Sequence, residues 1–181
     1  MNEILLKENI LTELLWEAED MSHLTPPEQA SFRGMVKASR KLIYHDDEGK
    51  VAAGYCSKVS TLYEPFAIYI KNLFGDGIYF YHESDSLAYL LIVSGGRIVS
   101  GTDCFIARDL FDELMKHPVK YEHLDIKPLT KFQFDAVIER CRVHQASLKR
   151  RRRRFIMTIS FSAGTILLMI LAVILEFYVN G

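Results

Sequence analysis

Acidic side chains near the ends of predicted strands are the residues whose type and spacing could hold a divalent metal ion. Asp103 and Asp125 lie in two predicted strand regions, whereas Asp76 and Glu83 only flank the first strand, residues 78–82. A ribonuclease-H-type nuclease needs several carboxylates clustered at strand ends to bind its metal ions. Because the first strand contains no acid, the pattern favours no metal site, and a membrane-anchored nuclease is the least favoured interpretation.

Nucleotide-binding and zinc-binding patterns are also missing from the sequence. A phosphate-binding loop runs from glycines into a helix, but Gly95 and Gly96 lie between predicted strands and residues 75–77 lead into a strand. Cys141 and His144 are close on one predicted helix, yet no second pair of ligands accompanies them. The sequence therefore predicts a protein that is not an enzyme and that has no cofactor and no metal ligands.

The strongest pattern in the chain is an uninterrupted apolar stretch, residues 155–175. These 21 residues contain no charged side chain and no proline. As an α-helix the stretch would be about 32 Å long, which matches the roughly 30 Å hydrocarbon core of a bilayer. The alternative, a buried helix of a soluble domain, rarely reaches this length without a charge. We therefore predict one transmembrane helix, followed by a short external tail, residues 176–181.

Six consecutive basic residues directly precede the predicted span. They are Lys149, Arg150, Arg151, Arg152, Arg153 and Arg154. Cationic flanks stay on the cytoplasmic side of a membrane, so this juxtamembrane run, residues 149–154, predicts that residues 1–154 face the cytoplasm. The run would also attract anionic lipid headgroups. A nuclear-import or RNA-binding patch is the alternative, which the adjacent span disfavours.

The charge of the remaining chain is acidic. The whole chain has 22 Lys and Arg against 23 Asp and Glu. Without the basic run and Glu176, residues 1–148 carry 16 basic and 22 acidic side chains. Such a region would repel phosphates, so we expect no nucleic-acid partner. Three widely spaced cysteines fit a reducing compartment rather than a disulfide-linked secreted scaffold.

Small residues lie near the cytoplasmic end of the predicted span. Ser160 and Gly164 form a small-xxx-small pair, which permits close contact between two membrane helices. This pair makes a homo-oligomer through the membrane helix one expectation. The alternative is that the hydroxyl groups of this region only bond to the backbone of their own helix.

The first part of the chain has helical periodicity and an acidic polar face. Apolar residues recur at three- and four-residue steps over residues 3–21, which predicts an amphipathic helix. Four acidic residues are candidates for docking in a basic-rimmed groove of a partner. They are Glu13, Glu17, Glu19 and Asp20. The alternative is that the helix covers its own domain. A second helix, predicted from Thr25 to about Arg40, completes an N-terminal helical segment, residues 1–40.

Residues 41–148 are predicted to form a cytoplasmic α/β domain. Two strands joined by a polar turn, 41–45 and 50–56, and a helix, 65–74, come first. Strands follow at 78–82, 87–93, 97–100 with a continuation towards residue 106 left open, and 119–126. Helices are predicted at 107–117 and from residue 131. Three antiparallel strands followed by a right-handed crossover to a fourth form a small mixed sheet, the kernel of actin-like and ribonuclease-H-like domains. The predicted fold class is α+β, of β-β-β-α-β-α order, with N-terminal helices and one C-terminal transmembrane helix.

The stretch Gly75–Leu114 resembles inner-membrane assembly proteins of type IVb pili. The shared features are a GDGIY-like strand start, an AYLLIV-like run and a GGRIVSGTD-like turn and strand. The wider group includes the bitopic L-type inner-membrane protein of type II secretion. The resemblance implies an actin-like cytoplasmic domain that lacks ATPase activity and docks the assembly ATPase. Those proteins continue into a periplasmic region, whereas six residues follow the span here, so no periplasmic function is carried over.

These patterns together predict a non-enzymatic bitopic scaffold of the bacterial inner membrane. It would recruit a cytoplasmic partner, such as the assembly ATPase, to a type IV pilus or type II secretion-like machine. The alternative is a tail-anchored membrane sensor or regulator whose small cytoplasmic domain binds a ligand or a protein. The expected partners are the lipid bilayer, cytoplasmic subunits of the machine and a second copy of the chain.

Overall fold

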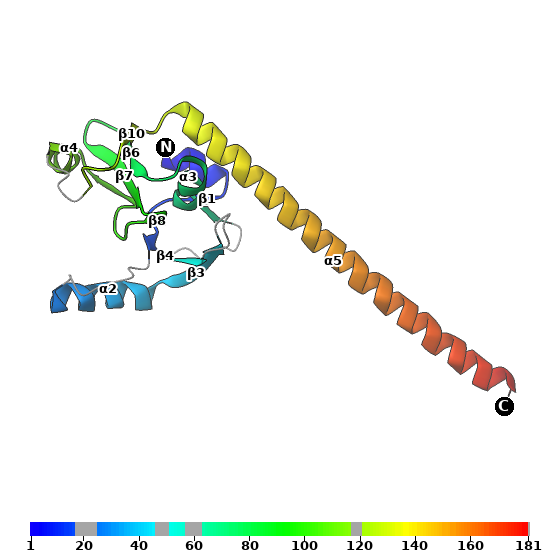
Figure 1. Ribbon diagram of the computed structural model, residues 1–181. Helices are drawn as coiled ribbons and strands as arrows, with labels where there is room; N and C mark the ends of the chain where they lie inside the picture. The colour runs from blue at the N-terminus through cyan, green and yellow to red at the C-terminus, as the bar shows by residue number, and fades with distance from the viewer. Residues whose placement is uncertain (17–24, 46–50, 57–62, 117–120, 181) are drawn as a thin grey trace. The chain divides into compact units, whose positions relative to one another are not determined.

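The computed structural model describes residues 1–16, 25–45, 51–56, 63–116 and 121–180 (Figure 1). Contacts within the chain divide it into a domain unit, Met1–Cys141, and a helical unit, Arg142–Gly181. The domain unit combines helices with several small sheets, and the chain ends in one long helix with an apolar stretch. The predicted α+β class is therefore confirmed.

The N-terminal residues form a short helix and two short strands instead of the long helix predicted over residues 3–21. The elements are α1 (Asn2–Lys7), β1 (Ile10–Leu11) and β2 (Leu15–Trp16). The prediction was wrong because Asn9 and Glu13 have φ angles of 59° and 62°. A left-handed backbone at these two residues is incompatible with a continuous right-handed helix.

A three-stranded sheet joins this N-terminal segment to the predicted hairpin. Its order is β2-β4-β3, with both pairings antiparallel. The elements are α2 (Pro26–Ala38), β3 (Arg40–His45) and β4 (Val51–Cys56). The predicted hairpin and the helix after Thr25 are confirmed. Gly54 lies opposite Trp16 in this sheet, and a Cβ there would lie 2.9 Å from Leu14 Cδ2, so a larger residue would force the Leu14 side chain to shift. A separate parallel pair joins β1 to β5 (Glu64–Pro65).

The largest sheet has the strand order β10-β6-β7-β8, and β9 also pairs with β7. Its strands are β6 (Gly77–His82), β7 (Leu87–Ser94), β8 (Arg97–Ile98), β9 (Cys104–Ala107) and β10 (Ile126–Pro128). Strands β6 and β7 are antiparallel, and β10 returns parallel to β6. The predicted third strand is present but is interrupted between β8 and β9. The relation to actin-like and ribonuclease-H-like domains stays a prediction.

The fourth strand of this sheet is shorter than predicted. We expected it over residues 119–126, but β10 begins only at Ile126. Tyr121–His123 form a turn before it, and residues 117–120 lie outside the described part of the chain. The apolar residues Tyr121 and Leu124 of this region lie outside any strand, but they pack against the core cluster that contains Phe111.

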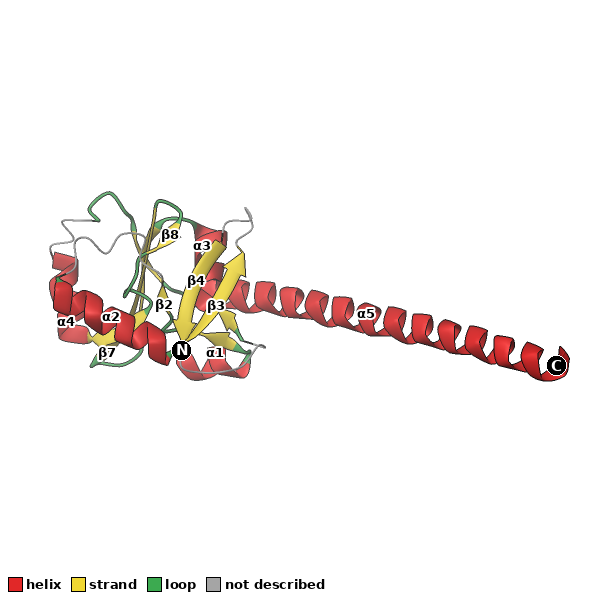
Figure 2. Cartoon of the chain, turned by 90° about the horizontal axis from the view of Figure 1, so that it is seen from below, coloured by secondary structure: helices red, strands yellow, loops and turns green. Residues whose placement is uncertain are grey.

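Two helices cover opposite faces of the largest sheet, α3 (Phe66–Phe74) and α4 (Arg108–Lys116) (Figures 1 and 2). Strand β7 supplies both faces. Tyr89, Leu91 and Val93 join the cluster on the α3 side, whereas Ala88, Leu90 and Ile92 join the cluster with Phe111 of α4. Strand β7 is therefore a central strand buried on both faces, since successive side chains of a strand point to opposite sides.

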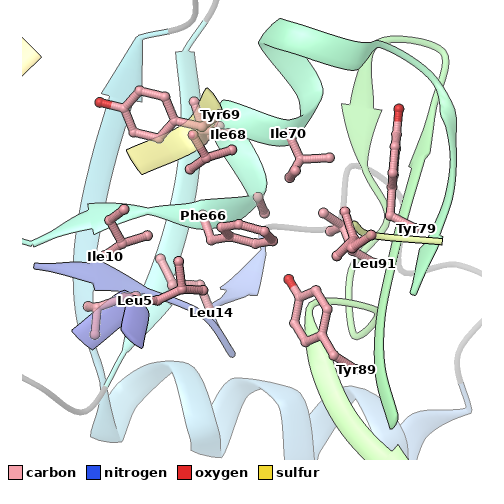
Figure 3. Close-up of a cluster of buried hydrophobic side chains, with 14 of the residues drawn as sticks. Leu5, Ile10, Leu14, Phe66, Ile68, Tyr69, Ile70, Tyr79, Tyr89 and Leu91 are labelled. Carbon is pink, nitrogen blue, oxygen red and sulfur yellow. The ribbon is translucent and has the colours of Figure 1, made fainter. Parts of the chain in front are cut away.

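The larger core cluster unites the N-terminal residues with the sheet (Figure 3). Leu5, Ile10 and Leu14 are at most 2% exposed, as are Phe66 and Tyr89. Figure 3 shows the three N-terminal side chains on one side of Phe66 and Tyr89 near it. The first 16 residues are therefore part of the domain core and not a separate helical segment.

Candidate functional site

The last helix, α5 (Lys131–Asn180), begins inside the domain unit. The helix begins at Lys131, where the sequence predicts its start. Gln133 Oε1 accepts hydrogen bonds from the Thr130 backbone N–H over 2.9 Å and from the Thr130 hydroxyl. A Gln at the third helical position that accepts from the backbone N–H before the helix forms one half of a capping box.

The first three turns of α5 are packed into the domain core. Val137 and Cys141 are 0% and 1% exposed. The ring of Phe134 stacks on Phe66 with centroids 5.7 Å apart and meets Tyr81 edge-on at 5.3 Å. Aromatic pairs of this kind add about 0.5–1.5 kcal/mol each beyond the apolar area that they bury. The beginning of α5 is therefore fixed to the domain by its own side chains.

The apolar stretch of α5 has the opposite environment. The side chains of Phe161, Leu167 and Leu168 are 80%, 67% and 68% exposed. Within the described residues, α5 is the one helix that is long and apolar enough to cross a membrane, and its most apolar window has no buried residue. A large apolar surface without a covering element is costly in water. The stretch is consistent with a single membrane span.

Hydroxyl groups in this stretch bond to the helix that carries them. Thr158 Oγ1 donates to the carbonyl oxygen of Arg154 over 3.0 Å, and Ser162 Oγ donates to that of Thr158 over 2.9 Å. For these residues the alternative of internal bonding is confirmed. A Cβ at Gly164 would meet no atom within 4 Å, so this position has space for a close neighbour. Helix contact through Ser160 and Gly164 stays a prediction.

The predicted carboxylate Asp103 is buried and is bound by four donors. The side chain is 2% exposed. Oδ1 accepts hydrogen bonds from Tyr89 Oη at 2.7 Å and the Glu13 backbone N–H at 3.0 Å. Oδ2 accepts from Trp16 Nε1 at 2.9 Å and the Leu14 backbone N–H at 3.2 Å. Because a carboxylate offers about four lone-pair positions, all of them are used within the protein.

The electrostatics of Asp103 follow from this environment. Burial raises the pKa of the Asp103 carboxyl group, and the hydrogen bonds from Tyr89, Trp16 and the backbone lower it in part. Burial and the adjacent Asp103 carboxylate also hold the pKa of Tyr89 well above its ordinary value. The hydrogen bonds of Asp103 connect the N-terminal segment to β7, so this carboxylate has a structural role.

The structure does not bring the two candidate metal ligands together. Asp125 precedes β10 and its side chain is 85% exposed, whereas Asp103 precedes β9. Strands β6 and β7 lie between β10 and β9 in the sheet. Within the described residues no group of three or more His, Cys, Asp or Glu side chains could hold a metal ion.

The Gly95–Gly96 turn is held by Asp76. The backbone N–H groups of Gly95 and Gly96 donate to the two Asp76 carboxylate oxygens over 2.7 and 2.9 Å. Both glycines have positive φ angles, 60° and 71°, as expected for a tight hairpin. Lys127 Nζ donates to the Asp76 carbonyl oxygen over 2.9 Å. Because a carboxylate of the chain occupies these N–H groups, the turn is a structural one.

The acidic residues proposed for partner docking are in different situations. Glu13 lies at a left-handed position beside Asp103, not on the face of a helix. Glu17, Glu19 and Asp20 lie outside the described residues, so partner docking through them stays a prediction. All six residues of the basic run, residues 149–154, are exposed on α5.

Sequence reasoning missed the role of Asp103, which it treated only as a possible metal ligand. One usable signal is that Asp103 is an acid inside a predicted strand region, in a chain with a lone tryptophan and several tyrosines that need acceptors. Comparison of the chain with protein-family models, with curated proteins and with solved structures found no match.

Proposed function

We propose that this protein is a non-enzymatic bitopic scaffold whose domain unit faces the cytoplasm of a bacterium and whose apolar helix spans the inner membrane. The observation that supports it is the change of environment along α5. Val137 and Cys141 are buried in the domain core, whereas the apolar residues from Phe155 to Ile170 are exposed. Helix α5 is continuous from Lys131 to Asn180, so the same helix contributes residues to the domain core and carries the proposed membrane span.

The cytoplasmic partner in this proposal is the assembly ATPase of a type IV pilus or type II secretion-like machine. The support is the resemblance of Gly75–Leu114 to pilus assembly proteins. These residues form β6, β7, β8, β9 and α4, which is a coherent part of one sheet with its covering helix. The acidic balance of residues 1–148 is compatible with a basic docking surface on the partner.

Membrane insertion and orientation are tested on the full chain in native membranes. We expect the protein to stay in the pellet after an alkaline carbonate wash, and external protease to leave the domain unit intact. Replacement of Arg150–Arg154 by Gln should give mixed orientations, since the positive charges hold this end in the cytoplasm. Release by carbonate, or an unchanged orientation of the variant, would contradict the proposed topology.

Recruitment is tested by detergent pull-down of the tagged full chain from its native cells. We expect the assembly ATPase to be recovered with the native chain and to be lost with Ile70→Asp, which disrupts the domain core but leaves the membrane helix intact. Recovery of the ATPase with both chains would place the contact outside the folded domain. Recovery of no machine component would refute recruitment while leaving the membrane topology standing.

A further inference from the structure

The region around the basic run has a large charge imbalance within the chain. Between Glu139 and Glu176 the sequence contains no acidic residue, whereas it contains Arg140, Arg142 and the basic run, residues 149–154. The six side chains of the run are exposed, and within the described residues none of them forms an ion pair. The described part of the chain therefore supplies no negative charge that balances this run, which leaves the run available to negatively charged groups of another molecule.

The geometry of the run distinguishes between possible sources of that charge. Successive residues of an α-helix are rotated by about 100°, so six in a row point to all sides of the axis. They occupy a rise of about 7.5 Å, which is within one Debye length at physiological salt, so the six charges act together. We call residues 149–154 the cationic collar. A nucleic acid or a protein groove would contact one side of it, whereas lipid headgroups surround a membrane helix completely.

The composition of the collar indicates the chemical group that it binds. Five of its six residues are arginines. A lysine or an arginine at these positions would set the orientation of the membrane helix equally well. The planar guanidinium group of arginine can in addition bind two phosphate oxygens at once. The apolar stretch starts at Phe155, directly after the collar, so the collar lies at the level of the phosphates when that stretch is in the hydrocarbon core. We infer that the cationic collar binds the phosphate groups of anionic phospholipids in preference to zwitterionic ones.

This inference rests on the proposed membrane span, and its test uses the full chain reconstituted in vesicles. The vesicles consist of phosphatidylcholine with a trace of spin-labelled phosphatidylglycerol or spin-labelled phosphatidylcholine, and electron paramagnetic resonance measures the fraction of label held by the protein. We expect the phosphatidylglycerol label to associate several-fold more strongly, on the order of the fivefold that one cation at an anionic surface provides. The preference should fall as salt is raised.

Two variants with the same loss of charge separate the collar from overall electrostatics. In the first, Arg150–Arg154 are replaced by Gln, and the preference should fall to about one. In the second, five exposed cations of the domain unit are replaced by Gln, and the preference should stay. These are Arg33, Lys37, Arg40, Lys116 and Lys131. Equal loss in both variants, or no preference in the native chain, would overturn the inference.

Additional experiments identify which phosphate-containing molecule the collar binds. They also distinguish a failure of this inference from a failure of the proposed membrane span. Inorganic phosphate at millimolar concentration should not displace the labelled lipid; displacement would indicate a site for free phosphate instead. RNA added to the vesicles should not displace it either, and displacement would favour a nucleic-acid patch. Carbonate extraction of the same vesicles reports insertion. An inserted chain without lipid preference refutes the collar inference alone, whereas an extracted chain refutes the span.

Discussion

Helix α3 and the apolar stretch of α5 have similar compositions and opposite environments. In α3, the residues Phe66–Ile70 are at most 7% exposed, because the sheet and the N-terminal segment cover them (Figure 3). In α5, Phe161 is 80% exposed and Leu168 is 68% exposed. Both segments lack acidic residues. The two segments also differ in length: the nine residues of α3 span about 14 Å, whereas the 21 apolar residues span about 32 Å, close to the hydrocarbon thickness of a bilayer.

This comparison teaches that an apolar helix becomes a core helix only when other parts of the chain supply a complementary surface. The cover of α3 comes from residues distant in sequence, including Leu5, Leu14 and Tyr89. The described residues supply no such cover for residues 155–170. A lipid bilayer would provide it, and the free energy of burying this surface would then stabilise membrane insertion instead of the fold.

The largest effect is expected from deletion of residues 1–16, which removes part of the cover of α3. Leu5, Ile10, Leu14 and Trp16 are buried, and loss of one such side chain costs about 2–5 kcal/mol. Loss of all four costs about 8–20 kcal/mol, which is as large as the 5–15 kcal/mol by which domains are usually stable. We expect no cooperative thermal unfolding of the deleted chain in detergent. A folded deleted domain would show that this segment is an accessory one.

A paired substitution tests the comparison itself. Ile70→Asp puts a charge into the covered helix, where Ile70 is 0% exposed, and should destabilise the domain by on the order of 5 kcal/mol. Leu168→Asp puts the same charge into the exposed stretch and should leave the unfolding temperature of the domain unchanged. It should instead reduce membrane insertion by about 3 kcal/mol. An effect of Leu168→Asp on domain unfolding would show that this stretch packs on protein.

Asp103→Asn tests the polar connection between the N-terminal segment and β7 at constant side-chain volume. An amide keeps one acceptor oxygen and replaces the other by a donor, so two of the four donors lose their acceptor. We expect destabilisation of about 3 kcal/mol in chemical denaturation, because each unsatisfied buried group costs about 1–3 kcal/mol. The matched control is Asp125→Asn, whose side chain is 85% exposed and which should change stability by less than about 0.5 kcal/mol.

The smallest effect is the pH dependence contributed by Tyr79. Burial, helped by the carboxylates of Asp76 and Asp125, raises the pKa of Tyr79 to about 12. The unfolded chain ionises near the ordinary value of 10.0. A raised pKa stabilises the folded state below pH 10, and this contribution, on the order of 1 kcal/mol, is lost as the pH rises through 12. The difference in absorbance at 295 nm between the native chain and Tyr79→Phe should titrate near pH 12; titration near pH 10 would contradict the buried hydroxyl.

The sequence predicted those elements whose signals are local. The antiparallel strands at 41–45 and 50–56, the strands on either side of Gly95–Gly96 and the start of the last helix at residue 131 were predicted correctly, because turn residues and periodicity act over a few residues. The helix predicted over residues 3–21 was wrong in its described part, residues 3–16, although Leu5, Ile10 and Leu14 are buried as the periodicity indicates. Periodicity marks which residues are covered but does not reveal the left-handed residues that interrupt the helix.

The candidate site divides in the same way. Residues 149–175 alone determine the basic run and the apolar stretch, because charge and hydropathy need no partner to be recognised. Only the tertiary structure decided that Asp103 binds Glu13, Leu14, Trp16 and Tyr89, and that the first 16 residues belong to the core. Asp103 and Glu13 are 90 positions apart in the chain. The physical reason is that such a contact depends on the folding of everything between them, which no local pattern encodes.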